Sequence, residues 1–262
     1  MVQLMKPRIS AALLALLLGT SFAVLPQKAL AQDEITLIAP GGIRDAIQAM
    51  IPTFEKKTGL KVKATFGSGL GTKKQVASGE PFDVPVVQPP FPEVLASGNV
   101  VPSSQKPLAS VAVGFAVSKG APKPDISTPD AVRKLLLAAK SVSYPNPAGG
   151  AAAGVSFDET LKKLGIAEQM EPKLKRSQGG AAAMTMIAKG EVEIGLTFLS
   201  EMDVPGIEPV GPLPREISTP TTLVGFISTH AKNPAAAQKL LDYLSSSEAA
   251  AVYKAHGMQP GR

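Results

Sequence analysis

The chain contains no cysteine and no tryptophan among its 262 residues. Without cysteine there can be no disulfide bond, no thiolate metal ligand and no cysteine nucleophile. Histidine occurs only at positions 230 and 256, and neither stands at a metal-ligand spacing or within a recognisable Ser–His–Asp set. We therefore expect neither a bound metal nor a cofactor.

Long apolar runs are also scarce beyond the N-terminus. Lys6 and Arg8 precede an apolar core at residues 9–18, and Ala-Leu-Ala at residues 29–31 fits a signal-peptidase site. These features predict a secretion signal over residues 1–31, removed before Gln32. No later run approaches the roughly 18 apolar residues of a membrane span, and a lipid anchor would need a cysteine. We expect a periplasmic protein without a membrane anchor.

Strong charge of either sign is absent. The predicted signal contains three of the 27 basic residues and none of the 21 acidic ones, which leaves a net charge of +3 after cleavage. No basic run is interleaved with aromatic residues, so nucleic-acid binding is not indicated. This balance is compatible with a small anionic ligand.

Strand-like and helix-like segments alternate through the remaining chain, which is typical of α/β proteins with parallel-type sheets. Apolar β-type runs predict strands at 35–39, 62–66, 82–88, 110–117, 141–144, 173–176, 191–198, 207–210 and 222–228. Helical spacing predicts helices from 43 (with a kink or restart at Pro52), from the stretch 66–75 to about 78, and at 91–97, 130–139, 154–164, 180–189, 233–244 and 246–254.

The segment order predicts two lobes. Residues 32–113 and 224–262 would form lobe 1, and residues 114–223 would form lobe 2. Two crossing strands, near 110–117 and 222–228, would join the lobes. A cleft between two lobes is the default place for a small-molecule site.

The central motif is the stretch at residues 66–75, Phe-Gly-Ser-Gly-Leu-Gly-Thr-Lys-Lys-Gln. Its glycines permit positive φ and close approach of the backbone to a ligand. A helix that begins here would present N–H groups to an anion. Thr72 occupies a position where both the phosphate loop and the dinucleotide fingerprint need glycine, so neither motif is present. The plain alternative is a glycine-rich turn before a surface helix.

Three further strand-to-helix turns are rich in glycine, at residues 40–42, 148–150 and 179–180. Ligands of open α/β sheets bind at such turns, outside the carboxyl ends of the strands. The candidate substrate-binding residues are Gly42, Ile43, Arg44, Ser68, Gly69, Leu70, Thr72, Lys73, Gln88, Gly149, Gly150, Thr197 and Arg215. Three alternatives remain open: Arg44 is a solvated surface cation, Glu201 is an ordinary loop carboxylate, and Arg215 is paired with Glu216.

The sequence resembles the molybdate-binding type of periplasmic solute-binding protein at residues 54–59, 189–195 and 231–235. This resemblance implies the two-lobe, class II binding-protein fold and a monomer. Ser68 matches a ligand serine of that family, whereas Gly42 and Phe198 replace its other serine and its tyrosine. Arg44 and Lys73 add charge that a neutral oxyanion cage does not use, which favours carboxylate ligands.

A closer similarity is to the periplasmic aconitate isomerases, at residues 40–45, 67–74, 83–90 and 196–201. It implies a cofactor-independent isomerase that interconverts trans- and cis-aconitate by allylic proton transfer. In that interpretation Arg44, Lys73 and Arg215 hold carboxylates, and Glu201 or Lys73 is the base; the catalytic candidates are thus Glu201, Lys73 and Arg44.

The alternative is a solute-binding protein of an ABC transporter, with a permease as partner and a di- or tricarboxylate, or an oxyanion such as molybdate, as ligand. An adhesive or protein-binding module is disfavoured, because charged, glycine-rich strand ends lack the exposed aromatic residues of such surfaces.

Overall fold

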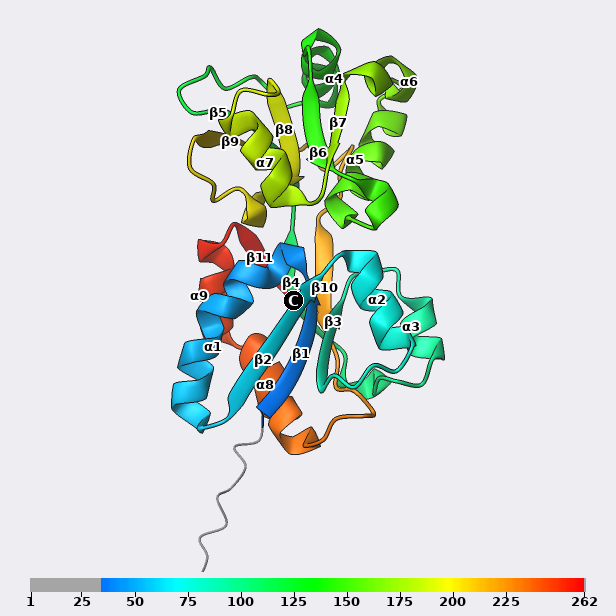
Figure 1. Cartoon of the computed structure of the whole chain (residues 1–262), viewed down its shortest axis with the longest axis vertical. Helices are drawn as coiled ribbons and strands as arrows, with labels where there is room; N and C mark the ends of the chain where they lie inside the picture. The colour runs from blue at the N-terminus through cyan, green and yellow to red at the C-terminus, as the bar shows by residue number, and fades with distance from the viewer. Residues whose placement is uncertain (1–33, 262) are drawn as a thin grey trace, which may run out of the picture. The chain divides into compact units, whose positions relative to one another are not determined.

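The computed structural model describes residues 34–261. The predicted secretion signal and its cleavage before Gln32 lie outside this range. The described residues form an α/β protein with two mixed sheets, each flanked by helices (Figure 1).

The first sheet has six strands in the order β11-β4-β10-β3-β1-β2. They are β1 (Glu34–Pro40), β2 (Lys61–Gly67), β3 (Val84–Val87), β4 (Lys106–Val111), β10 (Thr221–Gly225) and β11 (Met258–Pro260). Strand β1 is parallel to β2 and β3, whereas β10 pairs antiparallel with β3 and β4. The parallel strands bring their carboxyl ends to one edge of the sheet.

The second sheet has five strands in the order β7-β6-β8-β5-β9. They are β5 (Val113–Ser118), β6 (Val142–Pro145), β7 (Leu174–Ser177), β8 (Ile194–Phe198) and β9 (Ile207–Pro212). Strand β6 is parallel to β7 and β8, and β5 is antiparallel to β8 and β9. Both sheets thus combine a parallel centre with antiparallel strands.

The helices pack their apolar residues against these sheets. They are α1 (Arg44–Thr58), α2 (Gly69–Ala77), α3 (Pro92–Ala96), α4 (Pro129–Ala138), α5 (Ala152–Lys163), α6 (Ala167–Met170), α7 (Gly180–Ala188), α8 (Pro234–Leu244) and α9 (Ser247–Ala255). Short 3-10 turns follow several strands, including η1 (Gly41–Ile43), η3 (Pro147–Gly149) and η5 (Leu199–Glu201). Within residues 34–261, no helix is both long enough and apolar enough to span a membrane.

Helix α1 shows how packing overrides a local signal. It runs without interruption through Pro52, so the restart that the sequence indicated there does not occur. Met50 and Phe54, on either side of the proline, are both about 1% exposed. Burial of this apolar face favours one continuous helix despite the hydrogen bond that proline removes.

The chain changes sheets at Ala112, which corrects the prediction of one unbroken strand over residues 110–117. Val111 pairs with Thr221 in the first sheet, and Val113 pairs with Phe198 in the second. The return connection is the segment 213–220, between the end of β9 and the start of β10. The exact lobe boundaries, 32–113 with 224–262 and 114–223, remain a prediction.

Candidate functional site

A cavity of about 630 Å³ lies where the two sets of strand-to-helix turns meet. The first sheet contributes the turns after β1 and β2, with Gly42 and Gly69, and the second contributes those after β6 and β7, with Gly149 and Gly180. All four glycine-rich turns therefore reach the same cavity. Its size is within the usual range of small-molecule sites, about 300–1,000 Å³.

Helix α2 begins inside the glycine-rich stretch, at the cavity wall. Ser68 is its N-cap, and the Ser68 hydroxyl accepts a hydrogen bond from the Gly71 N–H at 3.0 Å. The N–H group of Leu70, one residue before Gly71, donates to the carbonyl oxygen of Gly150 at 3.3 Å. This bond joins a turn of the first sheet to a turn of the second, so the wall is continuous here.

Gln88 also lines the cavity, close to Gly69 at this helix start. Its side chain is 3% exposed, and its Nε2 has no hydrogen-bond partner among the described residues. A Cβ at position 69 would lie only 2.2 Å from the Gln88 Oε1, so the carboxamide needs a glycine there. An unpaired buried amide costs about 1–3 kcal/mol, which points to a role for this group.

Glu201 is the acidic group inside the cavity. It ends η5, which follows β8, and its Oε2 accepts a hydrogen bond from the Thr197 hydroxyl at 2.5 Å. Burial raises the pKa of Glu201; the nearby Asp45 carboxylate adds to this, whereas the Thr197 and Phe198 hydrogen bonds and the Arg44 charge oppose it. A carboxyl group with a raised pKa holds its proton more tightly than an ordinary glutamate and can both accept and return it.

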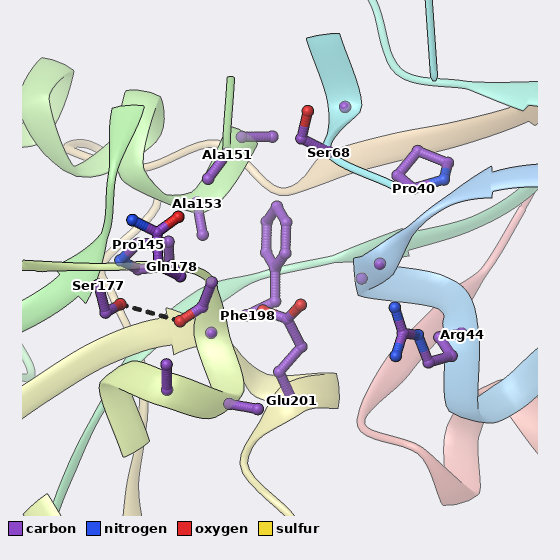
Figure 2. A pocket seen from close by; sticks show the side chains of 18 of the residues that line it. Pro40, Arg44, Ser68, Pro145, Ala151, Ala153, Ser177, Gln178, Phe198 and Glu201 are labelled. Atoms are coloured by element: carbon purple, nitrogen blue, oxygen red, sulfur yellow. Dashed lines mark hydrogen bonds between the residues drawn. The ribbon is translucent and has the colours of Figure 1, made fainter. Parts of the chain in front are cut away.

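The Glu201 carboxyl group packs against the first residue of α7, Gly180. A Cβ at Gly180, the first residue of α7, would lie 2.1 Å from the Glu201 Oε2 and 2.3 Å from the Thr197 Oγ1. Only glycine leaves room for the carboxyl group at this helix start. Figure 2 shows Glu201 and the Phe198 ring pointing into the cavity, with Ser68 and Arg44 at its other side.

The charged residues of the lining are mixed. Among the described residues it contains one cation, Arg44, and three acids, Asp45, Glu201 and Asp203. The Arg44 guanidinium lies 5.4 Å from the centroid of the Phe66 ring and makes no hydrogen bond or ion pair within residues 34–261. It is therefore available to a ligand. Asp45 and Asp203 are exposed, so solvent screens their charges.

Of the predicted residues, the structure brings together Gly42, Arg44, Ser68, Gly69, Gln88, Gly149 and Glu201 in the cavity lining. Thr197 stands behind Glu201 as its hydrogen-bond donor and is fully buried. Ile43, the last residue of η1, is buried in the core, and Leu70 and Gly150 contact each other outside the lining. Thr72 is buried, and its hydroxyl has no partner among the described residues.

Lys73 and Arg215 lie outside this lining. The Lys73 ammonium group donates to the carbonyl oxygen of Pro90 at 2.7 Å and lies 3.6 Å from Glu93. It is thus engaged with the loop after β3. Arg215 lines a different cavity, beside β4, β10 and β11.

Three uncharged polar residues of the cavity lining were not predicted from the sequence: Asn146, Ser177 and Gln178. Asn146 caps η3, and the Ser177 hydroxyl donates to the carbonyl oxygen of Gly179 at 2.9 Å. Asn146 precedes the predicted glycine-rich turn at residues 148–150, and Ser177 and Gln178 precede the one at 179–180. Extending the prediction to the polar neighbours of each turn would have found them.

A metal centre is not formed by these residues. Within the described part of the chain, no three His, Asp or Glu side chains gather as metal ligands would. The chemistry open to this site is hydrogen bonding from amides and hydroxyl groups, charge pairing with Arg44, and proton transfer at Glu201.

The chain is similar in sequence both to an enzyme and to solute-binding proteins. It is 31% identical over 264 residues to the aconitate isomerase of a Pseudomonas species, covering 98% of both chains. It is also 31% identical over 229 residues to the molybdate-binding protein ModA of Azotobacter vinelandii, covering 86% of this chain and 89% of that one.

The solved periplasmic molybdate-binding protein of Azotobacter vinelandii superposes with a TM-score of 0.71 at 20% identity, covering 86% of this chain and 98% of that one. This likeness confirms the predicted two-lobe, class II binding-protein fold. A model of the bacterial extracellular solute-binding proteins matches residues 35–259. The chain belongs to the family of bacterial extracellular solute-binding proteins.

Proposed function

We propose that the protein is a cofactor-independent isomerase that interconverts trans- and cis-aconitate by moving an allylic proton. The observation that carries this proposal is the Glu201 carboxyl group, which has a raised pKa and lines the same cavity as Arg44 and Ser68. An ionised carboxylate beside the ligand weakens the binding of an anion, because like charges repel. A proton-transfer enzyme needs such a group.

The reaction balances with Glu201 alone as the proton carrier. Its carboxylate removes a proton from the CH₂ group of aconitate, between a carboxylate and the double bond. The electron pair of that C–H bond moves into a new double bond to the central carbon, and the former double-bond electrons develop on the other terminal carbon. Glu201 returns the proton there, so one C–H bond breaks, one forms, and no oxidant is consumed.

The cavity offers distinct partners for the substrate carboxylates. Arg44 supplies a guanidinium, which pairs with carboxylates through two parallel hydrogen bonds. Ser68 supplies a hydroxyl group at the positive end of α2, where the Leu70 and Gly71 N–H groups are already bonded to Gly150 and to Ser68 itself. These groups would also stabilise the charge that spreads onto a carboxylate during proton removal. Lys73 as a second carboxylate ligand or base would require it to leave Pro90.

A solute-binding protein for a di- or tricarboxylate, or for an oxyanion such as molybdate, is the second candidate. The family match and the 31% identity to a molybdate-binding protein favour it. In that case an ABC transporter permease would be the partner. For either function we infer export to the periplasm through the predicted N-terminal signal and action as a monomer.

The deciding experiment is an incubation of the purified protein, residues 32–262, with trans-aconitate, followed by chromatographic detection of cis-aconitate. We expect cis-aconitate to form at a rate proportional to protein concentration. Ligand-dependent thermal stabilisation without product would support the solute-binding candidate. A larger melting shift with molybdate than with any carboxylate would contradict both carboxylate assignments.

The role of Glu201 has its own test. We expect Glu201→Gln to lower turnover by about 10²–10⁴-fold, the usual contribution of a general base, while binding of aconitate persists. Glu191→Gln is the matched control, because Glu191 is an exposed carboxylate outside the cavity lining. Equal turnover in the two variants would remove Glu201 from the role of base.

A further inference from the structure

A second cavity, of about 710 Å³, lies beside the return connection between the two sheets. Its walls come from three neighbouring strands of the first sheet, β10, β4 and β11, from the end of α9, and from the segment 213–220. It shares no lining residue with the cavity that contains Glu201. It is therefore a separate feature of the molecule.

A row of polar side chains crosses this part of the sheet. Ser110 on β4 is the register partner of Thr222 on β10 and of Gln259 on β11. Register partners project to the same face of a sheet, so the three side chains are neighbours. Within residues 34–261 none of the three side chains makes a hydrogen bond. The row thus offers two hydroxyl groups and an amide that remain available to a ligand.

Two cations stand beside this row. Arg215 is on the segment 213–220, and Lys254 is near the end of α9. Within the described residues neither makes a hydrogen bond or ion pair, and no Asp or Glu belongs to the lining. By contrast, several other cations of the surface pair with carboxylates, as Lys61 does with Glu55 and Arg176 with Glu171. The positive charge here lacks a counter-charge.

We infer that this second cavity is a binding site for a small polyanion bearing carboxylate or phosphate groups. A guanidinium binds either group through its planar fork, and an ammonium adds a point charge. The hydroxyl groups of Ser110 and Thr222 and the Gln259 amide supply neutral hydrogen-bond donors. A polyanion carries enough negative charge to pair with both Arg215 and Lys254, which line the same cavity.

Calorimetric titration at constant ionic strength tests the inference. The probes are tricarballylate, a saturated tricarboxylate that cannot isomerise, and inorganic phosphate in a separate arm. We expect at least one probe to bind the wild-type protein at two classes of site. In Arg44→Ala, where binding to the first cavity is weakened, the class that belongs to the second cavity should remain. The arm with the stronger binding identifies the preferred anion.

Arg215→Ala combined with Lys254→Ala should abolish the second class or weaken it at least tenfold. Arg133→Ala with Lys134→Ala removes the same charge from the exposed face of α4 and should leave both classes intact. The inference is overturned if neither probe shows the second class in the wild-type protein, or if both double variants behave alike. Neither result depends on whether the protein isomerises aconitate.

Discussion

At the scale of single residues, Glu201 links protonation to activity. A general base must be ionised, so the rate should fall as pH drops through its pKa. Because burial raises the pKa of Glu201, the acid limb of kcat/KM should be centred above the value of about 4.3 for an ordinary glutamate. A pH–rate profile from pH 4 to pH 9 measures this. A midpoint at or below pH 4.3 would assign the limb to another group.

The same raised pKa has a consequence for stability. The native state holds the Glu201 proton more tightly than the unfolded chain, so this group stabilises the fold at low pH. That contribution is lost as pH rises through the raised native pKa. Glu201→Gln, which is never ionised, should therefore gain melting temperature relative to the wild type as pH increases from 4 to 8.

Melting curves at each pH provide this comparison, with Glu191→Gln as the reference for removal of an exposed carboxylate. The difference between wild type and Glu191→Gln should change little over the same range. A Glu201→Gln variant that loses stability relative to wild type as pH rises would contradict the sign of the shift.

For Gln88 we expect substitution to weaken ligand binding without loss of stability, because its buried Nε2 is unpaired in the described structure. We expect Gln88→Leu to leave the free protein as stable as the wild type, or more so, since an orphaned donor is removed. Substrate binding should weaken about 5–100-fold, equivalent to about 1–3 kcal/mol for one hydrogen-bond partner. Melting temperature and KM, measured on the same preparation, separate these two effects.

A matched variant is Gln75→Leu, on the same helix–strand unit but outside the cavity lining. It should change KM little. If Gln88→Leu destabilised the free protein and left KM unchanged, Gln88 would be a packing residue and not a ligand donor.

At the scale of elements, glycine-rich turns after apolar strands were predictable, because short stretches of neighbouring residues determine both the turn conformation and the order of strand and helix. This is why Gly42, Ser68, Gly69, Gly149 and Glu201 could be proposed before the fold was known. The direction of Lys73 was not predictable. The stretch at residues 66–75 predicts the start of the next helix, and α2 begins there, at Gly69; within this helix Lys73 is bonded to Pro90, in the loop after β3, which local sequence does not reveal.

The contact between α7 and η5 gives an element-scale prediction. Gly180→Ala places a Cβ where the Glu201 carboxyl group and the Thr197 hydroxyl now lie. The Glu201 side chain can swing aside, so we expect turnover to fall at least tenfold with only a modest loss of melting temperature. Thr185→Ala, on the exposed face of the same helix, is the control and should retain turnover. Equal turnover in both variants would show that the carboxyl position is not critical.

At the scale of the whole molecule, the two-lobe arrangement followed from the order of segments, but the point of crossing did not. The apolar run at residues 110–117 has no polar or proline interruption, so it predicts a single strand. The exchange of partners at Ala112 depends on pairing with distant segments, β10 on one side and β8 on the other. For the same reason Arg215 could not be assigned to a cavity from local sequence.

A second contact, in addition to the Leu70–Gly150 bond, joins elements of the two sheets. The Ser200 hydroxyl of η5 donates to the carbonyl oxygen of Gly42 in η1 at 2.7 Å, and both residues are buried. Ser200→Ala would leave that carbonyl unpaired whenever the elements meet, at a cost of about 1–3 kcal/mol. When they separate, water can satisfy the carbonyl, so the variant should shift the protein toward the separated state.

We therefore expect Ser200→Ala to bind tricarballylate about 5–100-fold more weakly, corresponding to that cost, with an unchanged rate of proton transfer once substrate is saturating. Small-angle X-ray scattering should show ligand-dependent compaction in the wild type and require more ligand in the variant. Ser245→Ala, a hydroxyl at the end of α8 far from the cavity lining, is the control. If the two variants titrated alike, closure would depend on the Leu70–Gly150 side alone.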